Sequence, residues 1–174
     1  MNARTVLDSP IGPLYLEASA VGLRRLAFGT GRKFPTAQAF EDGAVHPAAA
    51  EVLARAAGQL REYFEGTRKE FDLPLDIEGT SFQKRVWQAI AAIPYAESIS
   101  YKRLAEEAGA PGAYRAAGAA CGANHVAIVV PCHRVVGSDR SLHGFGGGLP
   151  VKRWLLDHEA STVMAGAARQ AVLV

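Results

Sequence analysis

The sequence predicts an α/β domain followed by a mostly helical domain, an α/β + α arrangement within 174 residues. Two observations predict it. In the first part, short stretches with alternating apolar and polar residues flank one long amphipathic helix, which is typical of a small sheet domain. In the second part, apolar residues recur at helical spacing in several short segments separated by glycine and proline. We therefore expect domains over residues 1–78 and 79–160, and a tail over residues 161–174.

The first domain begins with strands. Proline and glycine at residues 9–13 predict a turn, and alternation over residues 14–17 predicts a strand after it. A second strand, with Leu26 and Phe28, follows a turn at Gly22, and residues 29–47 have the composition of a loop.

An amphipathic helix is predicted over residues 47–64, where Gly66 ends it. Alternating apolar residues over 71–77 predict another strand. No nucleophile lies beside a base in this half of the chain, so we interpret it as scaffold.

The second domain begins with three predicted helices. Thr80 and Gln83 fit a capping box, and the helix that they start runs up to Pro94. Ser100 can cap a second helix over residues 101–108, and a third follows over residues 113–121. Two short helices joined by a tight turn form a helix-turn-helix, which commonly places a helix in a DNA groove.

The third helix consists almost entirely of small residues, and Arg115 is its one long cation. Such a helix either packs tightly in the core with a solvated arginine or approaches another backbone closely. Its sequence alone does not decide between the two.

The last segments surround a cysteine. A β-branched run over residues 126–130 predicts a buried strand that ends next to Cys132. A glycine-rich loop follows over residues 137–148, and Pro150 starts a helix that we expect to end at Glu159. The tail has no clear periodicity, so its order is left open.

Composition and charge narrow the function classes. Hydrophobic residues make up 49% of the chain, which is too apolar for disorder, yet no segment approaches the roughly 20 apolar residues of a membrane helix. The N-terminus lacks the apolar stretch of a signal peptide. We therefore expect a cytoplasmic protein that does not bind a membrane. The net charge is +2, and residues 81–159, with nine basic and six acidic residues, have a net charge of +3. This distribution permits nucleic-acid binding without requiring it.

Cys121 and Cys132 are the two cysteines. They form neither a disulfide framework nor a Cys-x-x-Cys zinc motif, so no metal site is predicted. Zinc bound through histidine and carboxylate side chains stays open, although no spacing in the sequence requires it. Cys132 has a possible base next to it, His133, and an acid that could orient that base, Glu159, in the following helix. Cysteine, base and acid together are typical of nucleophilic catalysis. Adjacent residues of an extended chain point to opposite sides, so we expect a water molecule to bridge the thiol and His133.

Residues 131–135, Pro-Cys-His-Arg-Val, preceded by Gly122, Ala123 and Asn124, resemble the active-site signature of the O6-alkylguanine-DNA alkyltransferases. The resemblance covers most of the chain, at residues 9–14, 81–87, 99–101, 115–118, 144–149 and 152–156. It implies a ribonuclease H-like N-terminal domain and a winged helix-turn-helix-like C-terminal domain.

The resemblance also implies an activity. The protein would act as a monomer on double-stranded DNA, through the minor groove, and flip an O6-alkylguanine, or an O4-alkylthymine, out of the duplex. The thiolate of Cys132 would take the alkyl group in a single turnover that consumes no cofactor. A nucleoid-associated location follows from this DNA repair activity.

The resemblance assigns roles residue by residue. His133 would be the base, Glu159 would orient it, Asn124 would hold the cysteine segment and Tyr101 would donate to the purine N3. Arg115 would replace the flipped nucleotide in the stack, and the Val135 carbonyl would accept from the guanine amine. Phe145 would stack on the alkyl group or line the pocket, and Gly146 would also belong to the pocket. Other contacts with DNA would come from Tyr114, Ala116, Ala117 and Gly118.

Two positions depart from the pattern of the family. Gly146 stands where many members have a hydroxyl residue, and His125 where some have proline. Two other functions are weighed against alkyl transfer. A lesion sensor or regulator with an incidental cysteine is compatible with the helix-turn-helix, and a cysteine hydrolase or redox thiol is compatible with Cys132. The paralogous alkyltransferase-like proteins lack the cysteine, so Cys132 argues against that branch.

Overall fold

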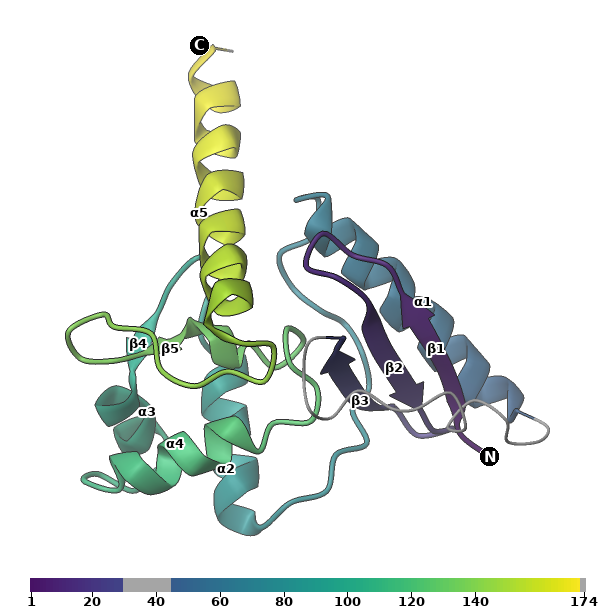
Figure 1. Cartoon of the computed structure of the whole chain (residues 1–174), viewed down its shortest axis with the longest axis horizontal. Coiled ribbons are helices and arrows are strands. Elements are labelled where there is room, and N and C mark those ends of the chain that lie inside the picture. The colour runs from purple at the N-terminus through teal and green to yellow at the C-terminus, as the bar shows by residue number, and fades with distance from the viewer. Residues whose placement is uncertain (30–44, 173–174) are drawn as a thin grey trace.

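The computed structural model describes residues 1–29 and 45–172 (Figure 1). Its strands are β1 (Ala3–Leu7), β2 (Leu14–Ala18), β3 (Leu23–Phe28), β4 (Ile99–Ser100) and β5 (Val135–Val136). Its helices are α1 (Pro47–Phe64), α2 (Ser81–Ala91), α3 (Tyr101–Glu107), α4 (Tyr114–Gly122) and α5 (Leu149–Val172), and a 3-10 turn spans Cys132–Arg134. Most of the loop expected over residues 29–47 lies outside the described residues.

The N-terminal part is a three-stranded antiparallel sheet, in the order β1-β2-β3, with α1 packed against it (Figure 1). The two predicted strands are confirmed as β2 and β3. Strand β1 escaped prediction because only its ends, Ala3 and Leu7, are buried. Its other residues pair with β2 at the margin of the sheet, where burial does not impose an alternating pattern.

The strand predicted over residues 71–77 is wrong. The segment is extended, but it makes only one bridge to β3, in which the Leu23 amide donates to the Pro74 carbonyl at 2.8 Å and the Asp76 amide donates to Leu23 at 3.0 Å. Pro74 has no N–H group, which limits the ladder there. Gly22 permits this close approach, because a Cβ atom at that position would lie 2.6 Å from the Pro74 carbonyl oxygen.

The C-terminal part contains the predicted helices. The capping box of α2 forms between Thr80 and Gln83, and Ser100 caps α3 through the amide of Arg103. Helices α3 and α4 follow one another across a short turn and pack together with α2. The Trp87 indole on α2 donates to the Ala120 carbonyl on α4 at 2.9 Å. Strands β4 and β5 pair in parallel and contact α3.

The buried strand predicted over residues 126–130 is also wrong. Four of these residues are buried and Val129 is partly buried, but they form a turn in which the Val130 amide donates to the Val126 carbonyl at 3.0 Å. Ile128 has φ = 72°, a left-handed conformation that is strained for a β-branched residue. Burial explains the apolar run, and the turn explains why no ladder forms.

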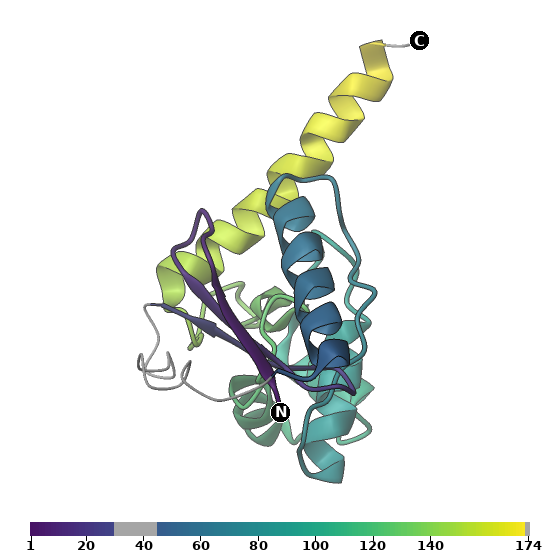
Figure 2. The ribbon, with the colours of Figure 1, turned by 90° about the vertical axis from the view of Figure 1, so that its right-hand side faces the viewer.

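Helix α5 is longer than predicted. It continues past Glu159 to Val172, so most of the tail is helical. Figures 1 and 2 show that its C-terminal turns project away from the rest of the chain. Alanine, which dominates this stretch, has the highest helix propensity and gives no periodic signal when it is exposed on all sides.

The two parts meet through backbone and core contacts. The Leu26 amide on β3 donates to the His125 carbonyl at 2.8 Å, beside a bridge from Leu26 to Val126. One buried cluster includes residues of both parts. The prediction of a small sheet domain followed by a helical domain is therefore confirmed. None of the helices in the described ranges is long and apolar enough to span a bilayer.

Candidate active site

Cys132 lies at the wall of a cavity between the two parts of the chain. Its side chain is 6% exposed, and the cavity has a volume of about 450 Å³. The cavity is lined by three groups of residues, from β3, from the end of α4 with the turn after it, and from the glycine-rich loop: Arg25, Leu26, Ala27, Phe28, Cys121, Gly122, Asn124, His125, Ala127, Gly144, Phe145, Gly146 and Gly148. Cys132 begins a 3-10 turn, so the expectation of an extended chain at this residue is wrong.

Asn124 ties together the turn that precedes Cys132. Its side-chain amide donates to the Val130 carbonyl at 2.8 Å, and its side-chain oxygen accepts from the Val126 amide at 3.0 Å. Both ends of the turn are thereby joined to one side chain. These bonds help to maintain the strained Ile128 conformation three residues before Pro131.

Three groups favour the thiolate form of Cys132. The neighbouring Cys121 thiol, followed by the Asn124 amide and the Lys152 charge, lowers the pKa of Cys132 in spite of its burial. The pKa of Cys121 is raised, because this thiol donates to Cys132 and is buried. Cys132 is therefore the more nucleophilic of the two thiols.

His133 is fully buried and points at Glu159, with its Nε2 atom 2.7 Å from Glu159 Oε1. Nε2 donates this bond, so Nδ1 is the acceptor nitrogen of the neutral ring. Nδ1 is buried and has no hydrogen-bond partner within the described residues. Burial lowers the pKa of His133, although Glu159 opposes this effect. A neutral imidazole with a free acceptor can take a proton.

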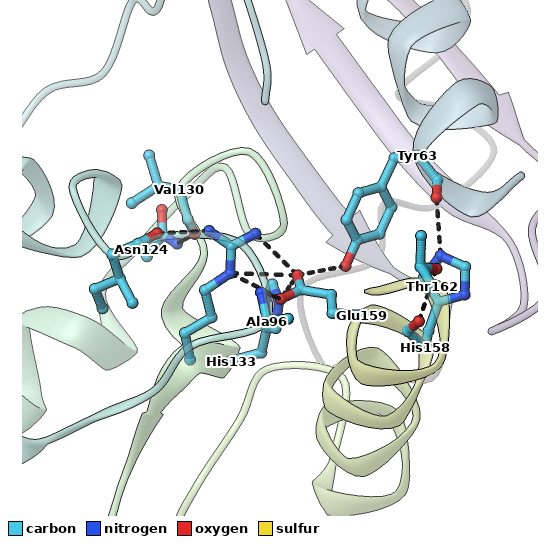
Figure 3. Close-up of polar contacts among 10 residues, drawn as sticks. Tyr63, Ala96, Asn124, Val130, His133, His158, Glu159 and Thr162 are labelled. Atoms are coloured by element: carbon cyan, nitrogen blue, oxygen red, sulfur yellow. Dashed lines mark hydrogen bonds and ion pairs between the residues drawn. The ribbon is translucent and has the colours of Figure 1, made fainter. Parts of the chain in front are cut away.

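Glu159 accepts hydrogen bonds from four residues in three segments of the chain (Figure 3). Besides His133, it accepts from the Arg134 guanidinium at 3.0 Å, the Tyr63 hydroxyl at 2.9 Å and the Ala96 amide at 2.9 Å. Burial would raise the pKa of Glu159, but His133 and Arg134 outweigh it and lower the pKa to about 2. The carboxylate is thus ionised and held in one orientation.

Tyr101 and Lys152 form a pair near the cysteine. The buried Lys152 ammonium donates to the Tyr101 hydroxyl at 3.4 Å and to the His143 carbonyl at 3.1 Å. Burial, with the two cysteines, raises the pKa of Tyr101 to about 12, so its hydroxyl keeps its proton. A Cβ atom at Gly118 would lie 3.6 Å from the Tyr101 ring, so α4 passes close to this ring.

The residues predicted to bind DNA are only partly gathered on one surface. Tyr114, Arg115 and Ala116 are exposed at the start of α4, and the Arg115 guanidinium lies 6.0 Å from the Tyr114 ring centroid. Gly118 is half-buried, and Ala117 is fully buried, so Ala117 faces the core.

The predicted pocket residues also lie in different places. Phe145 and Gly146 line the cavity beside Cys132, and the Phe145 ring packs on Phe28 at 5.2 Å. Val135 is fully buried in β5, where it pairs with Ile99. Its side chain is part of the core, which leaves its main chain for a contact with substrate.

Several contacts were missed at the level of sequence. The thiol of Cys121 donates to the Cys132 carbonyl at 3.9 Å, a contact that no sequence motif indicated. Lys152 is fully buried on the same face of α5 as Leu155 and Glu159. Their spacing of three and four residues was the available signal, because it places a lysine on an apolar stripe. Tyr63 joins the site from α1, for which no local pattern exists.

No group of three or more His, Cys, Asp or Glu side chains within residues 1–29 and 45–172 is arranged to bind a metal ion.

Comparison with known proteins identifies relatives along nearly the whole chain. The family described as 6-O-methylguanine DNA methyltransferase, DNA binding domain, matches residues 81–161, and the one described as its ribonuclease-like domain matches residues 2–77. The methylated-DNA--protein-cysteine methyltransferase of Methanosarcina barkeri is 43% identical over 158 residues, which cover 91% of this chain and 97% of the relative. That of Mycobacterium tuberculosis is 45% identical over 163 residues, which cover 91% and 93%.

Solved structures agree with these matches. The crystal structure of Mycobacterium tuberculosis O6-methylguanine methyltransferase has a TM-score of 0.81 and 44% identity, covering 93% of this chain and 94% of that one. The structure of Mycobacterium tuberculosis OGT in complex with DNA has a TM-score of 0.80 and 43% identity, covering 91% and 93%.

Proposed function

The chain belongs to the methylated-DNA--protein-cysteine methyltransferase family, whose members repair DNA by alkyl transfer to a cysteine, and from this premise we propose that Cys132 accepts the alkyl group of O6-alkylguanine in duplex DNA. The observation that carries the assignment is the position of Cys132. It lies at a cavity wall, with a lowered pKa and with the neutral base His133 next to it.

In this mechanism the proton of Cys132 passes through a water molecule to Nδ1 of His133, and Glu159 stabilises the resulting imidazolium. The sulfur attacks the alkyl carbon in line, an S–C bond forms, and the C–O6 bond breaks. The Tyr101 hydroxyl donates to the purine N3, so that guanine leaves without a full negative charge. The ammonium of Lys152 lies 3.4 Å from the Tyr101 oxygen. It stabilises the negative charge that develops on this oxygen as the hydroxyl donates to the purine. The thioether has no ready leaving route, so each molecule acts once.

The DNA is held, in this proposal, through the minor groove by a monomer. The exposed start of α4, with Tyr114, Arg115 and Ala116, contacts the duplex, and its small residues permit a close approach. Arg115 fills the gap left by the flipped nucleotide. Phe145, Gly146 and the Val135 carbonyl contact the flipped base, and the reaction takes place in the cytoplasm, at the nucleoid.

The finger role of Arg115 is tested by Arg115→Ala. Because flipping is needed only in a duplex, the rate with duplex O6-methylguanine should fall at least about tenfold, with little change for free O6-benzylguanine. Rates are measured by quench and peptide mapping. Arg153→Ala, which removes an exposed cation from α5, is the control for charge alone. Equal losses with both substrates would remove the finger assignment.

The function itself is tested by intact mass. After the protein is mixed with a duplex carrying one O6-methylguanine, the expected result is a gain of one methylene on the Cys132 peptide, which stops at one equivalent. Tight lesion binding without a mass gain would instead support a lesion sensor, and repeated turnover would support a hydrolase.

A further inference from the structure

One side chain of the N-terminal part reaches the catalytic groups. Tyr63, in the last turn of α1, is fully buried, and its hydroxyl donates to Glu159 Oε1 at 2.9 Å. The same oxygen accepts from Nε2 of His133 at 2.7 Å. Figure 3 shows the Tyr63 hydroxyl pointing at the carboxylate of Glu159, with α1 behind it. Tyr63 is thus one hydrogen bond away from the group that holds the base.

We propose that Tyr63 is a positioning residue for alkyl transfer, through the Glu159 oxygen that orients His133. The inference rests on the proposed function, in which His133 takes the proton of Cys132. It also means that the N-terminal part is more than a scaffold, because it completes the set of donors around Glu159.

The position of Tyr63 is itself well determined. The side chain of His158, beside Glu159 on α5, bonds through Nε2 to the Tyr63 carbonyl at 2.8 Å. The Tyr63 ring packs on the rings of Phe71 and Tyr95, with centroid distances of 5.6 Å and 6.1 Å. Helix α5 therefore bonds to Tyr63 at both its main-chain carbonyl and its hydroxyl. A donor held this way restricts the rotation of the carboxylate that it bonds.

The hydroxyl also affects the basicity of His133. Burial, with Glu159 beside it, raises the pKa of Tyr63 well above its ordinary value, so the hydroxyl is always a donor. A donor disperses the negative charge of the carboxylate and weakens its pull on the proton of His133. The other titratable and charged groups around Tyr63, Glu159 and His133 come from the loop after α2, from the 3-10 turn and from α5. They are Tyr95, Arg134, Lys152 and His158. Tyr63→Phe removes the hydroxyl that bonds to Glu159 without changing a charge.

The test is Tyr63→Phe, with Tyr15→Phe as the matched control. Tyr15 is a buried tyrosine on β2 whose hydroxyl donates to Glu17 at 3.2 Å, away from Cys132. In Y63F the pKa of His133, followed by NMR, should rise by about half a unit or more, since one hydrogen bond to a charged group is lost. The acidic limb of the pH–rate profile with free O6-benzylguanine should move to higher pH by a similar amount. Y15F should leave both unchanged.

The outcomes separate the inference from the function on which it rests. The positioning role would be overturned if Y63F and wild type had the same His133 titration and the same pH–rate profile. In that case, an equal loss of stability in Y63F and Y15F would identify Tyr63 as a packing residue. A wild-type protein that does not react with O6-benzylguanine or duplex O6-methylguanine would overturn the proposed function. The His133 titration does not depend on that reaction and would still decide the coupling.

Discussion

Cys132→Ser is expected to abolish alkyl transfer and to leave the fold and DNA binding intact. Serine is close in size to cysteine, so the packing at this 6% exposed position is kept. A hydroxyl, however, is scarcely ionised at neutral pH, and the lowered pKa on which the thiol depends has no counterpart in serine. The rate should fall by at least about a thousandfold. Intact mass after reaction with duplex O6-methylguanine measures the transfer, and anisotropy of labelled DNA measures binding.

Cys121→Ser is the matched variant, because Cys121 is the other buried thiol and touches Cys132. It should still gain one methylene per molecule, at a reduced rate, since the neighbouring thiol that lowers the pKa of Cys132 has been replaced. A methylene found on the Cys121 peptide, or one still gained by C132S, would contradict the assignment of the acceptor.

Glu159→Gln is expected to destabilise the fold as well as to slow the reaction. The change leaves the buried Arg134 guanidinium without its anionic partner, and it replaces the charged acceptor that holds His133 with a weaker, neutral amide oxygen. Breaking one half of a buried ion pair typically costs about 3–5 kcal/mol. Urea unfolding at neutral pH should show a loss of about 3 kcal/mol. Asp157→Asn, an exposed change of the same charge on the same helix, should have almost no effect.

The pH dependence of stability should distinguish the contribution of the Glu159 charge from the contribution of side-chain packing. The pKa of Glu159 is about 2 in the folded protein, below its ordinary value of 4.5. A lowered carboxyl pKa means that its stabilisation is complete above about pH 4.5 and is lost as the pH falls toward 2. The wild-type free energy of unfolding should therefore drop by about 3 kcal/mol across this window. The E159Q curve should be flatter there, and parallel curves would show that the Glu159 charge does not stabilise the fold.

Part of the candidate site could be predicted from the sequence. Cys132, His133 and Glu159 were predicted together, and the structure brings His133 and Glu159 within hydrogen-bond distance. Their roles remain predictions until the variants above are measured. The strands predicted at residues 71–77 and 126–130 were wrong for a shared reason. An apolar pattern reports burial, whereas a strand also requires a neighbouring strand with free N–H and C=O groups.

Features that depend on neighbours within one helical turn could be predicted from residue spacing. The capping box of α2 and the Ser100 cap of α3 form between residues three apart, so their hydrogen bonds can be read from spacing alone. The distant groups that surround Cys132 and Glu159, in contrast, are brought there by the packing of the whole chain. Tyr63 lies 96 residues from Glu159, and Lys152 lies 51 residues from Tyr101. Local periodicity predicts that such side chains are buried, but the packing of the whole chain selects the polar partner that each one meets.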